Sequence, residues 1–338
     1  MHNDPLARRG FLAGTLGLAL FGATACGSSS ESSSTSTSSA GSASASASAS
    51  ASAASGGGET PSLESLTAEV PDKFKQYTYK DSQIGKSVPY NLYVPADYDK
   101  SKTYPLVLYI ADSSLAGKEV TAPLSQYGAL IWASESEQAK HESIVLVPTY
   151  PEVIIDDHDS FTTTDYVELT TRLLDSVTKK YSVDPKRIYG TGQSMGCMTV
   201  MYLAAKHPGL FAAELFVSGQ WDISELENLA KEKFFYIAAG GDEKASGGQA
   251  EVKKMLKSAG VSYQEATWDA TWSEAQYASA AKKLFAAGDS INFATFKTGT
   301  VLETSGASSA PMGGEHMASF EPAYKITALR DWLFEQSA

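Results

Sequence analysis

Short apolar runs alternate with longer amphipathic stretches through most of the chain. Residues 74–79 and 88–94 mix apolar and polar positions in alternation, which predicts two leading strands paired as an antiparallel hairpin. Further runs are apolar almost throughout, as in strands buried on both faces: residues 105–110, 143–148, 187–190, 213–218 and 234–239.

Stretches with helical spacing separate these strands. Residues 165–181 carry apolar side chains three and four positions apart, and residues 195–207, 252–259 and 324–334 are further predicted helices. Alternating strands and helices predict an α/β fold with a mainly parallel central sheet, antiparallel leading strands and helices on both faces. Chemistry in such sheets lies at the carboxyl ends of the strands. The pattern leaves open whether residues 263–268 or 292–296 form the last strand.

The first 26 residues have the pattern of an export signal. Arg8 and Arg9 precede an apolar run over residues 11–25, which is shorter than the ~20 residues that a membrane-spanning helix needs. The paired arginines resemble a twin-arginine signal. Residues 23–26 resemble a lipobox, although the usual Leu is Ala23, and this predicts lipidation of Cys26, with palmitate among the attached acyl chains. We expect an exported protein, anchored at the outer side of the cell membrane or secreted.

Composition divides the rest of the chain into a tether and one domain. Residues 27–58 are Ser, Ala, Gly and Thr with a single Glu, which predicts a disordered tether. Residues 59–338 suffice for one large domain. The whole net charge of −12 belongs to this domain, which argues against a nucleic-acid partner. Cys197 is the only cysteine besides Cys26, so neither a disulfide framework nor a cysteine-based metal site is expected.

A serine motif follows the predicted strand at residues 187–190. Residues 192–196 read Gly-Gln-Ser-Met-Gly, the Gly-x-Ser-x-Gly pattern of a nucleophile elbow between a strand and a helix. Glycine is expected at positions 192 and 196 because a Cβ there would collide with neighbouring backbone. Ser194 is the predicted nucleophile, and the N–H of Met195 is one predicted oxyanion donor.

The sequence around this motif resembles a known superfamily. Residues 183–189 (VDPKRIY) followed by GQSMG are similar to secreted α/β-hydrolases related to polyhydroxybutyrate depolymerases, feruloyl esterases and predicted peptidases. Residues 88–95 (VPYNLYVP) and 104–108 (YPLVL) resemble their opening strands, and residues 332–334 resemble their final helix. The resemblance covers about residues 75–336 and is weakest over 270–310. It implies the α/β-hydrolase fold and a serine hydrolase that needs no metal or cofactor.

In this superfamily the catalytic residues follow the order Ser, acid, His. His316, in a Gly-rich loop before the last predicted helix, is the remaining histidine suited to act as base after the other four are set aside by position. Asp242, directly after the strand at residues 234–239, is the expected acid. Asp222 after the preceding strand is the alternative, and Glu243 is the next.

One departure from the relatives falls at the second oxyanion donor. Relatives carry His-Gly after the first parallel strand, whereas this chain has Ala-Asp-Ser-Ser over residues 111–114. The backbone N–H of Asp112 or Ser113 is the predicted donor. Loss of such a donor costs ~3–4 kcal/mol of transition-state stabilisation, so this departure also raises a non-catalytic alternative.

The residues that contact substrate are less clear in the sequence. Gln193 beside the nucleophile, Trp221 after a strand, and Trp268 or Trp272 are candidates for lining a cleft. The acidic run at residues 156–159 is interpreted as a surface loop and not as a metal site.

Together these features predict a secreted serine esterase with a Ser-Asp-His triad. Its expected substrates are esters of small molecules, of polysaccharides or of polyesters. A serine peptidase, a solute-binding lipoprotein and a non-catalytic surface-binding module are the alternatives. The oligomeric state stays open.

Overall fold

A nine-stranded sheet organises the part of the chain that the structure describes. The structure is a computed structural model in which residues 60–304 and 313–338 are described, so the predicted signal and tether lie outside it. The strands of the sheet are β1 (Lys75–Lys80), β2 (Ser87–Tyr93), β3 (Tyr104–Ile110), β4 (Ile144–Pro148), β7 (Val183–Gln193), β8 (Ala213–Val217), β9 (Phe234–Ala239), β10 (Gln264–Trp268) and β11 (Ile291–Phe296).

The sheet has the order β1-β2-β4-β3-β7-β8-β9-β11-β10. β2 pairs antiparallel with β1 and β4, and every other pair in this sheet is parallel. Gly192 of β7 lies opposite Ile110 of β3 and Phe216 of β8, so these three strands end side by side. A separate two-stranded ladder joins β5 (Ile155–Asp156) to β6 (Thr162–Thr163).

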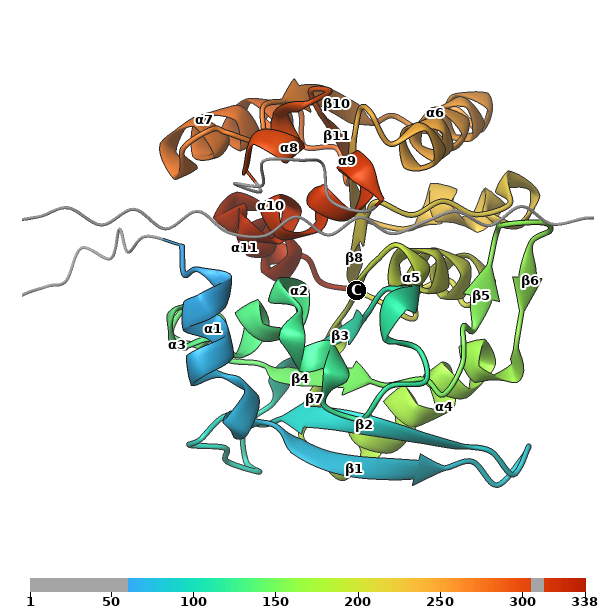
Figure 1. The fold of residues 1–338 in the computed structure, drawn as a ribbon, viewed down its shortest axis with the longest axis vertical. Helices are drawn as coiled ribbons and strands as arrows, with labels where there is room; N and C mark the ends of the chain where they lie inside the picture. Colours follow the sequence, from blue (N-terminus) through green and yellow to red (C-terminus); the bar gives the residue numbers. More distant parts are fainter. Residues whose placement is uncertain (1–59, 305–312) are drawn as a thin grey trace, which may run out of the picture. The chain divides into compact units, whose positions relative to one another are not determined.

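Helices cover both faces of the sheet (Figure 1). They are α1 (Leu63–Glu69), α2 (Tyr127–Leu130), α3 (Glu135–Gln138), α4 (Asp165–Lys180), α5 (Met195–Lys206), α6 (Glu243–Ser258), α7 (Glu274–Phe285), α8 (Thr300–Thr304), α9 (Gly314–Ala318), α10 (Phe320–Lys325) and α11 (Thr327–Glu335). Short 3₁₀ turns are η1 (Pro71–Lys73), η2 (Ser113–Leu115), η3 (Ala122–Ser125), η4 (Ile131–Ala133), η5 (Ile223–Glu225) and η6 (Glu227–Lys231).

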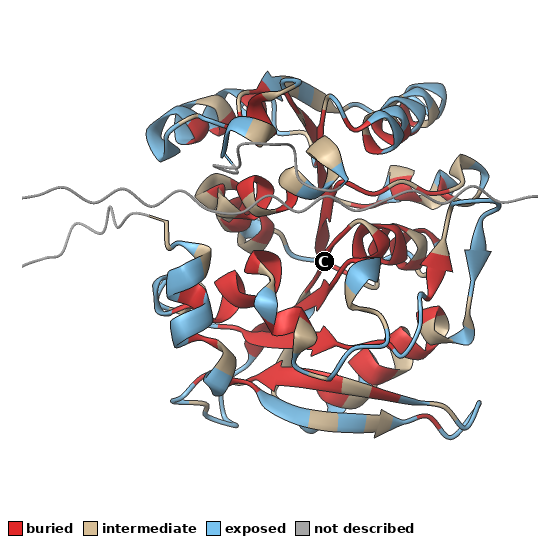
Figure 2. Cartoon of the chain, in the orientation of Figure 1, coloured by how far each residue is buried: buried red, intermediate tan, exposed pale blue. Residues whose placement is uncertain are grey.

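Two apolar cores fill the space between sheet and helices. One contains side chains of α1, α2, α7, α10 and α11, and the other contains side chains of α4, α5 and α6. Four of the strands, β3, β4, β8 and β9, are buried from end to end, while the outer faces of the helices are exposed (Figure 2). Within residues 60–304 and 313–338, no helix combines the length and apolar character needed to cross a bilayer.

The structure confirms the α/β class and most predicted elements, and it shifts three of them. Residues 263–268 and 292–296 were alternatives for one strand, but both are strands, and β11 lies between β9 and β10. The helix predicted at residues 252–259 begins at Glu243. The first half of this helix was not predicted because it contains Gly247 and Gly248, and glycine is a poor helix former. Gly248 is needed there because a Cβ would lie 2.3 Å from the Cβ of Gln220.

The helix predicted at residues 324–334 is broken at Ile326, whose backbone is extended. The buried guanidinium of Arg330 donates to the carbonyl oxygen of Tyr324 and to the hydroxyl of Thr327, 3.2 Å away. A carbonyl that loses its helical partner needs such a donor when it is buried. Arg330 therefore stabilises the break between α10 and α11.

Candidate active site

Ser194 lies in a strained turn between β7 and α5. Its φ of 52° and ψ of −117° are uncommon for a residue with a side chain. The N–H of Ser194 donates to the carbonyl of Val217 at 3.1 Å, which fixes the turn on β8. A Cβ at Gly192 would lie 2.5 Å from the Gly196 backbone, and a Cβ at Gly196 only 1.9 Å from the Ile110 carbonyl oxygen. The predicted need for glycine at both positions is confirmed.

The side chains of Ser194, His316 and Asp242 meet at the carboxyl end of the sheet. His316 Nδ1 is 2.6 Å from Asp242 Oδ2, and His316 Nε2 is 2.9 Å from Ser194 Oγ. An ionised carboxylate can only accept, so Nδ1–H donates to Asp242 and Nε2 is left to accept from the serine hydroxyl. The carboxylate is buried and the imidazole half-buried. This arrangement matches the order of roles in a serine hydrolase triad.

Asp242 also caps a helix. Its Oδ1 accepts from the N–H of Ala245 at 3.2 Å, at the start of α6, while Oδ2 faces His316. Asp222 instead caps η5 by accepting from Ser224, and Glu243 is exposed on α6. Of the three candidate acids, the structure brings only Asp242 to the histidine.

The altered loop after β3 turns the carboxylate of Asp112 toward hydrogen-bond donors. This buried carboxylate accepts from the N–H of Ser114 at 2.9 Å, from Gln193 Nε2 at 2.8 Å and from the side-chain amide of Gln126. Gln193 is itself buried and holds the loop, in place of the substrate contact expected for it. A substrate contact was expected because Gln193 is next to Ser194 in the sequence, but its side chain is directed at Asp112.

Two of the three predicted oxyanion donors, Met195 and Ser113, lie at the first positions of helical turns, and Asp112 is the N-cap residue before Ser113. Met195 begins α5 and Ser113 begins η2, so neither N–H has an acceptor within its own helix. Asp112 and Ser113 line the pocket that contains Ser194. Backbone N–H groups at such positions suit a developing negative charge.

A pocket of about 420 Å³ opens above the serine. Its wall includes residues that the sequence interpretation missed: Ser114, Asp157, His158, Met198, Ser218, Gly219, Gln220, Lys244, Ala245 and Met317. Asp157 holds part of this wall together, because it accepts from Gln220 and from Lys244 Nζ at 3.0 Å. The run at residues 156–159, interpreted as a surface loop, thus contributes two pocket residues. Hydrogen bonding to Asp156 raises the pKa of His158 above its ordinary value.

The tryptophans proposed for the cleft lie elsewhere. Trp268 is buried in the core against Phe235 and Tyr277, and Trp221 is buried behind the pocket wall against Phe161. Burial of these large apolar side chains is favourable, so the core accommodates both. Neither tryptophan lines the pocket. Trp272 lines a separate hollow of about 620 Å³ that shares Met317 with the serine pocket.

Cys197 is the free cysteine of the described residues, and it is buried. Burial raises the pKa of its thiol, so the reactive thiolate is disfavoured. Cys197 therefore has the environment of a small buried hydrophobe and not that of a reactive nucleophile.

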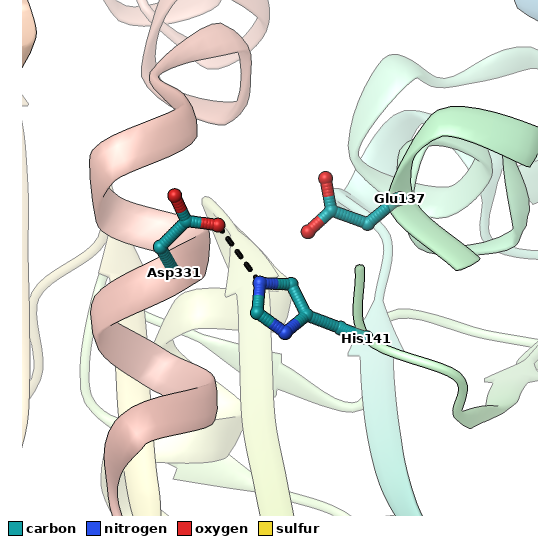
Figure 3. A group of neighbouring side chains, drawn as sticks. All are labelled: Glu137, His141 and Asp331. Carbon is teal, nitrogen blue, oxygen red and sulfur yellow. Dashed lines mark hydrogen bonds and ion pairs between the residues drawn. The ribbon is translucent and has the colours of Figure 1, made fainter. Parts of the chain in front are cut away.

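Figure 3 shows a second cluster of titratable groups, Glu137, His141 and Asp331, none of which lines the pocket. His141 Nε2 bonds Asp331 Oδ1 at 2.8 Å. Glu137 forms a buried ion pair with Arg330, Nε to Oε2, at 2.8 Å. The guanidinium charge beside Glu137 opposes a bound cation, so we interpret the cluster as an ion-pair network that joins α11 to the α3 segment.

Comparison with known proteins shows which family the chain belongs to. The family model described as "Putative esterase" matches residues 82–299, well over half of the chain. The chain therefore belongs to this esterase family, and it has the α/β-hydrolase fold. Among curated proteins, none matches the chain significantly.

Solved structures give the same fold. A thermostable esterase is 25% identical with a TM-score of 0.60, and the match covers 80% of this chain and 64% of that protein. A second structure is an S954A mutant of the feruloyl esterase module from Clostridium thermocellum, complexed with sinapinate. It is 15% identical with a TM-score of 0.52, and the match covers 81% of this chain and 92% of that module. The chain is thus similar to an esterase in sequence and fold, and to a feruloyl esterase in fold.

Proposed function

We propose that this chain is an exported serine esterase that forms an acyl-enzyme on Ser194. The observation that supports this most is the hydrogen-bonded series from Asp242 through His316 to Ser194, at the floor of an open pocket. Membership of an esterase family supports ester hydrolysis as the reaction.

The proposed roles follow from the geometry. Ser194 Oγ attacks the ester carbonyl while His316 Nε2 accepts the hydroxyl proton, and Asp242 stabilises the imidazolium that forms. The N–H of Met195, with that of Ser113 or Asp112, binds the developing oxyanion. His316 then returns the proton to the leaving alcohol. Water attacks the acyl-enzyme with His316 again as base, which releases the acid and restores Ser194.

The proposed substrates are carboxylic esters outside the cell. The wall combines apolar side chains such as Met198 and Met317 with polar ones such as Gln220 and Lys244. About 420 Å³ accommodates the acyl group of a small-molecule ester or one substituent of a polymer. Esters of small molecules, acylated polysaccharide and polyester are the substrate classes we propose.

Export and anchoring belong to the same proposal. The twin-arginine-like signal, the lipobox-like residues 23–26 and the tether at 27–58 support a lipoprotein held at the outer side of the cell membrane. Metabolic labelling with a palmitate analogue should mark the wild type, and Cys26→Ser should lose the label. A wild type that is released unlabelled would indicate a secreted protein without an anchor.

The deciding experiment is hydrolysis of p-nitrophenyl acetate and butyrate by the full chain. Ser194→Ala should lower kcat/KM by several orders of magnitude, the scale expected for a triad nucleophile. Ser258→Ala is the matched control, since this hydroxyl is exposed at the end of α6 and donates to the Lys254 carbonyl. A fluorophosphonate should label Ser194 and leave Ser194→Ala unlabelled.

Other outcomes favour other functions. Turnover of peptides but not of esters would indicate a serine peptidase. A folded wild type that neither hydrolyses esters nor reacts with the fluorophosphonate would favour a surface-binding role.

A further inference from the structure

The proposed base is carried by a very short helix. His316 lies on α9, five residues that follow the undescribed segment 305–312. A helix of this length is not stable alone, because nucleation costs more than its few hydrogen bonds return. Ser194 and Asp242 do not depend on so short an element, since they directly precede the longer helices α5 and α6. The position of His316 therefore depends on what holds α9 to its surroundings.

The residue before the base supplies one such connection. Glu315 Oε2 accepts from the N–H of Gly241 at 3.0 Å, and Glu315 Oε1 accepts from the N–H of Gly299 at 2.8 Å. Gly241 directly precedes Asp242, and Gly299 lies in the turn between β11 and α8. One carboxylate thus joins the turn that carries His316 to two other turns. One is the turn after β9, which carries Asp242, and the other is the turn after β11.

The fit around this carboxylate is close. A Cβ on Gly241 would lie 2.1 Å from Glu315 Oε1, so a side chain at residue 241 cannot coexist with the present position of Glu315. Glu315 is half-buried, and hydrogen bonds to a charged acceptor are about twice as strong as neutral ones.

A second connection holds the other end of α9. Ser319 Oγ donates to the His316 carbonyl at 2.7 Å and shares a hydrogen bond of 2.6 Å with Ser218 Oγ at the end of β8. This connection fixes the backbone of His316 relative to β8. It does not reach Asp242, so Glu315 is the direct polar connection between the base and acid turns apart from the His316–Asp242 bond itself.

We propose that Glu315 is a positioning residue, which sets the distance between His316 and Asp242 by binding the N–H of Gly241 and of Gly299. This inference rests on the proposed serine esterase function. Glu315 touches neither the serine nor the pocket. It acts through the imidazole, whose hydrogen bonds at 2.6 and 2.9 Å require both turns to be in register.

Glu315→Gln is the sharpest test because it keeps the size of the side chain. An amide offers one oxygen for two N–H donors, and its own N–H₂ group faces the second donor. One of the two turns must therefore move. We expect kcat for p-nitrophenyl acetate to fall by about 100-fold, the scale of a misplacement near 1 Å, with KM little changed. Glu303→Gln, an exposed carboxylate on α8, is the control for loss of charge and should retain wild-type kcat.

A double-mutant cycle separates positioning from a general structural defect. In a His316→Ala background, Glu315→Gln should cause no further loss of kcat, since the imidazole it acts on is gone. An equal loss in both backgrounds, or wild-type kcat in the single variant, would overturn the proposal.

The histidine proton gives a readout that does not depend on turnover. The downfield NMR resonance of His316 Nδ1–H, assigned by its absence in His316→Ala, should shift or broaden in Glu315→Gln and stay unchanged in Glu303→Gln. An unchanged resonance in Glu315→Gln refutes positioning even if the wild type proves inactive. An inactive wild type in which the resonance does respond refutes the esterase proposal alone.

Discussion

A buried carboxyl group at the far end of β8 leads to our most quantitative prediction. Glu214 is wholly buried, and neither of its carboxyl oxygens has a hydrogen-bond partner among the described residues. Burial raises its pKa well above the ordinary value, and the nearby charge of Glu232 raises it further, while Lys233 acts in the opposite direction. The folded chain therefore holds the Glu214 proton to a higher pH than the unfolded chain does.

The consequence for stability has a definite sign. Below the pKa of an unfolded Glu, about 4.3, both states hold the proton and pH has no effect through this residue. Above it the unfolded chain releases the proton while the folded chain keeps it. The free energy of unfolding then falls by about 1.4 kcal/mol per pH unit, up to the raised pKa of the folded state.

Glu214→Gln removes this dependence because an amide does not titrate. Urea unfolding, followed by tryptophan fluorescence at pH 5.5, 6.5 and 7.5, gives the free energy of unfolding of variant and wild type. The difference, variant minus wild type, should rise with pH, by at most about 1.4 kcal/mol per pH unit. Burying the amide adds a cost that is the same at each pH, so the slope is the quantity to compare. Ester hydrolysis should be unchanged, because Glu214 lies at the amino end of β8 and the pocket lies at its carboxyl end, beside Ser218.

The matched control is Glu335→Gln, a carboxylate exposed at the end of α11. Its stability curve should run parallel to that of the wild type. If the curve of Glu214→Gln is also parallel, then Glu214 is ionised in the folded protein and our account of its environment is wrong.

Three further perturbations test the elbow, the thiol and the buried ion pair. Gly196→Ala places a Cβ 1.9 Å from the Ile110 carbonyl oxygen, so we expect a lower melting temperature and a loss of kcat of about 100-fold; wild-type kinetics would contradict the elbow geometry. Cys197 should resist a maleimide until urea unfolds the chain, as located by peptide mass spectrometry, because burial raises the pKa of its thiol; rapid labelling of the native protein would refute this. Glu137→Gln leaves the buried Arg330 without its counter-charge and should cost about 3–5 kcal/mol by urea unfolding, whereas a loss below 1 kcal/mol would show that the pair contributes little.

The sequence predicted those elements of the fold whose own residues form a recognisable pattern of apolar and polar positions. β3, β8 and β9 were visible because strands buried on both faces are apolar almost throughout, and α4 because its apolar side chains keep helical spacing. The first half of α6 was missed, since Gly248 is required by contact with Gln220 and not by the helix. Such a contact joins residues far apart in the chain and leaves no local pattern.

Local patterns also identified the catalytic residues, whereas the pocket wall depends on contacts between residues far apart in the chain. Ser194 was identifiable because a strained turn needs glycine at fixed spacing, and His316 because few histidines were available. Asp157 and Lys244 meet in the pocket wall across a separation of 87 residues that no local motif marks. The prediction of Trp268 as a cleft residue came from its residue type, which serves a core equally well.

The loop after β3 shows how a local anomaly can be resolved in three dimensions. An acidic residue beside an oxyanion site should oppose the negative charge of the transition state. Here the carboxylate of Asp112 already accepts from Ser114, Gln126 and Gln193, so its charge is shared among donors on three segments. Gln193 comes from the elbow itself, which ties the loop carrying one proposed oxyanion donor to the turn carrying the other. The substitution that appeared to weaken the site in the sequence instead gives it a rigid connection between its two halves.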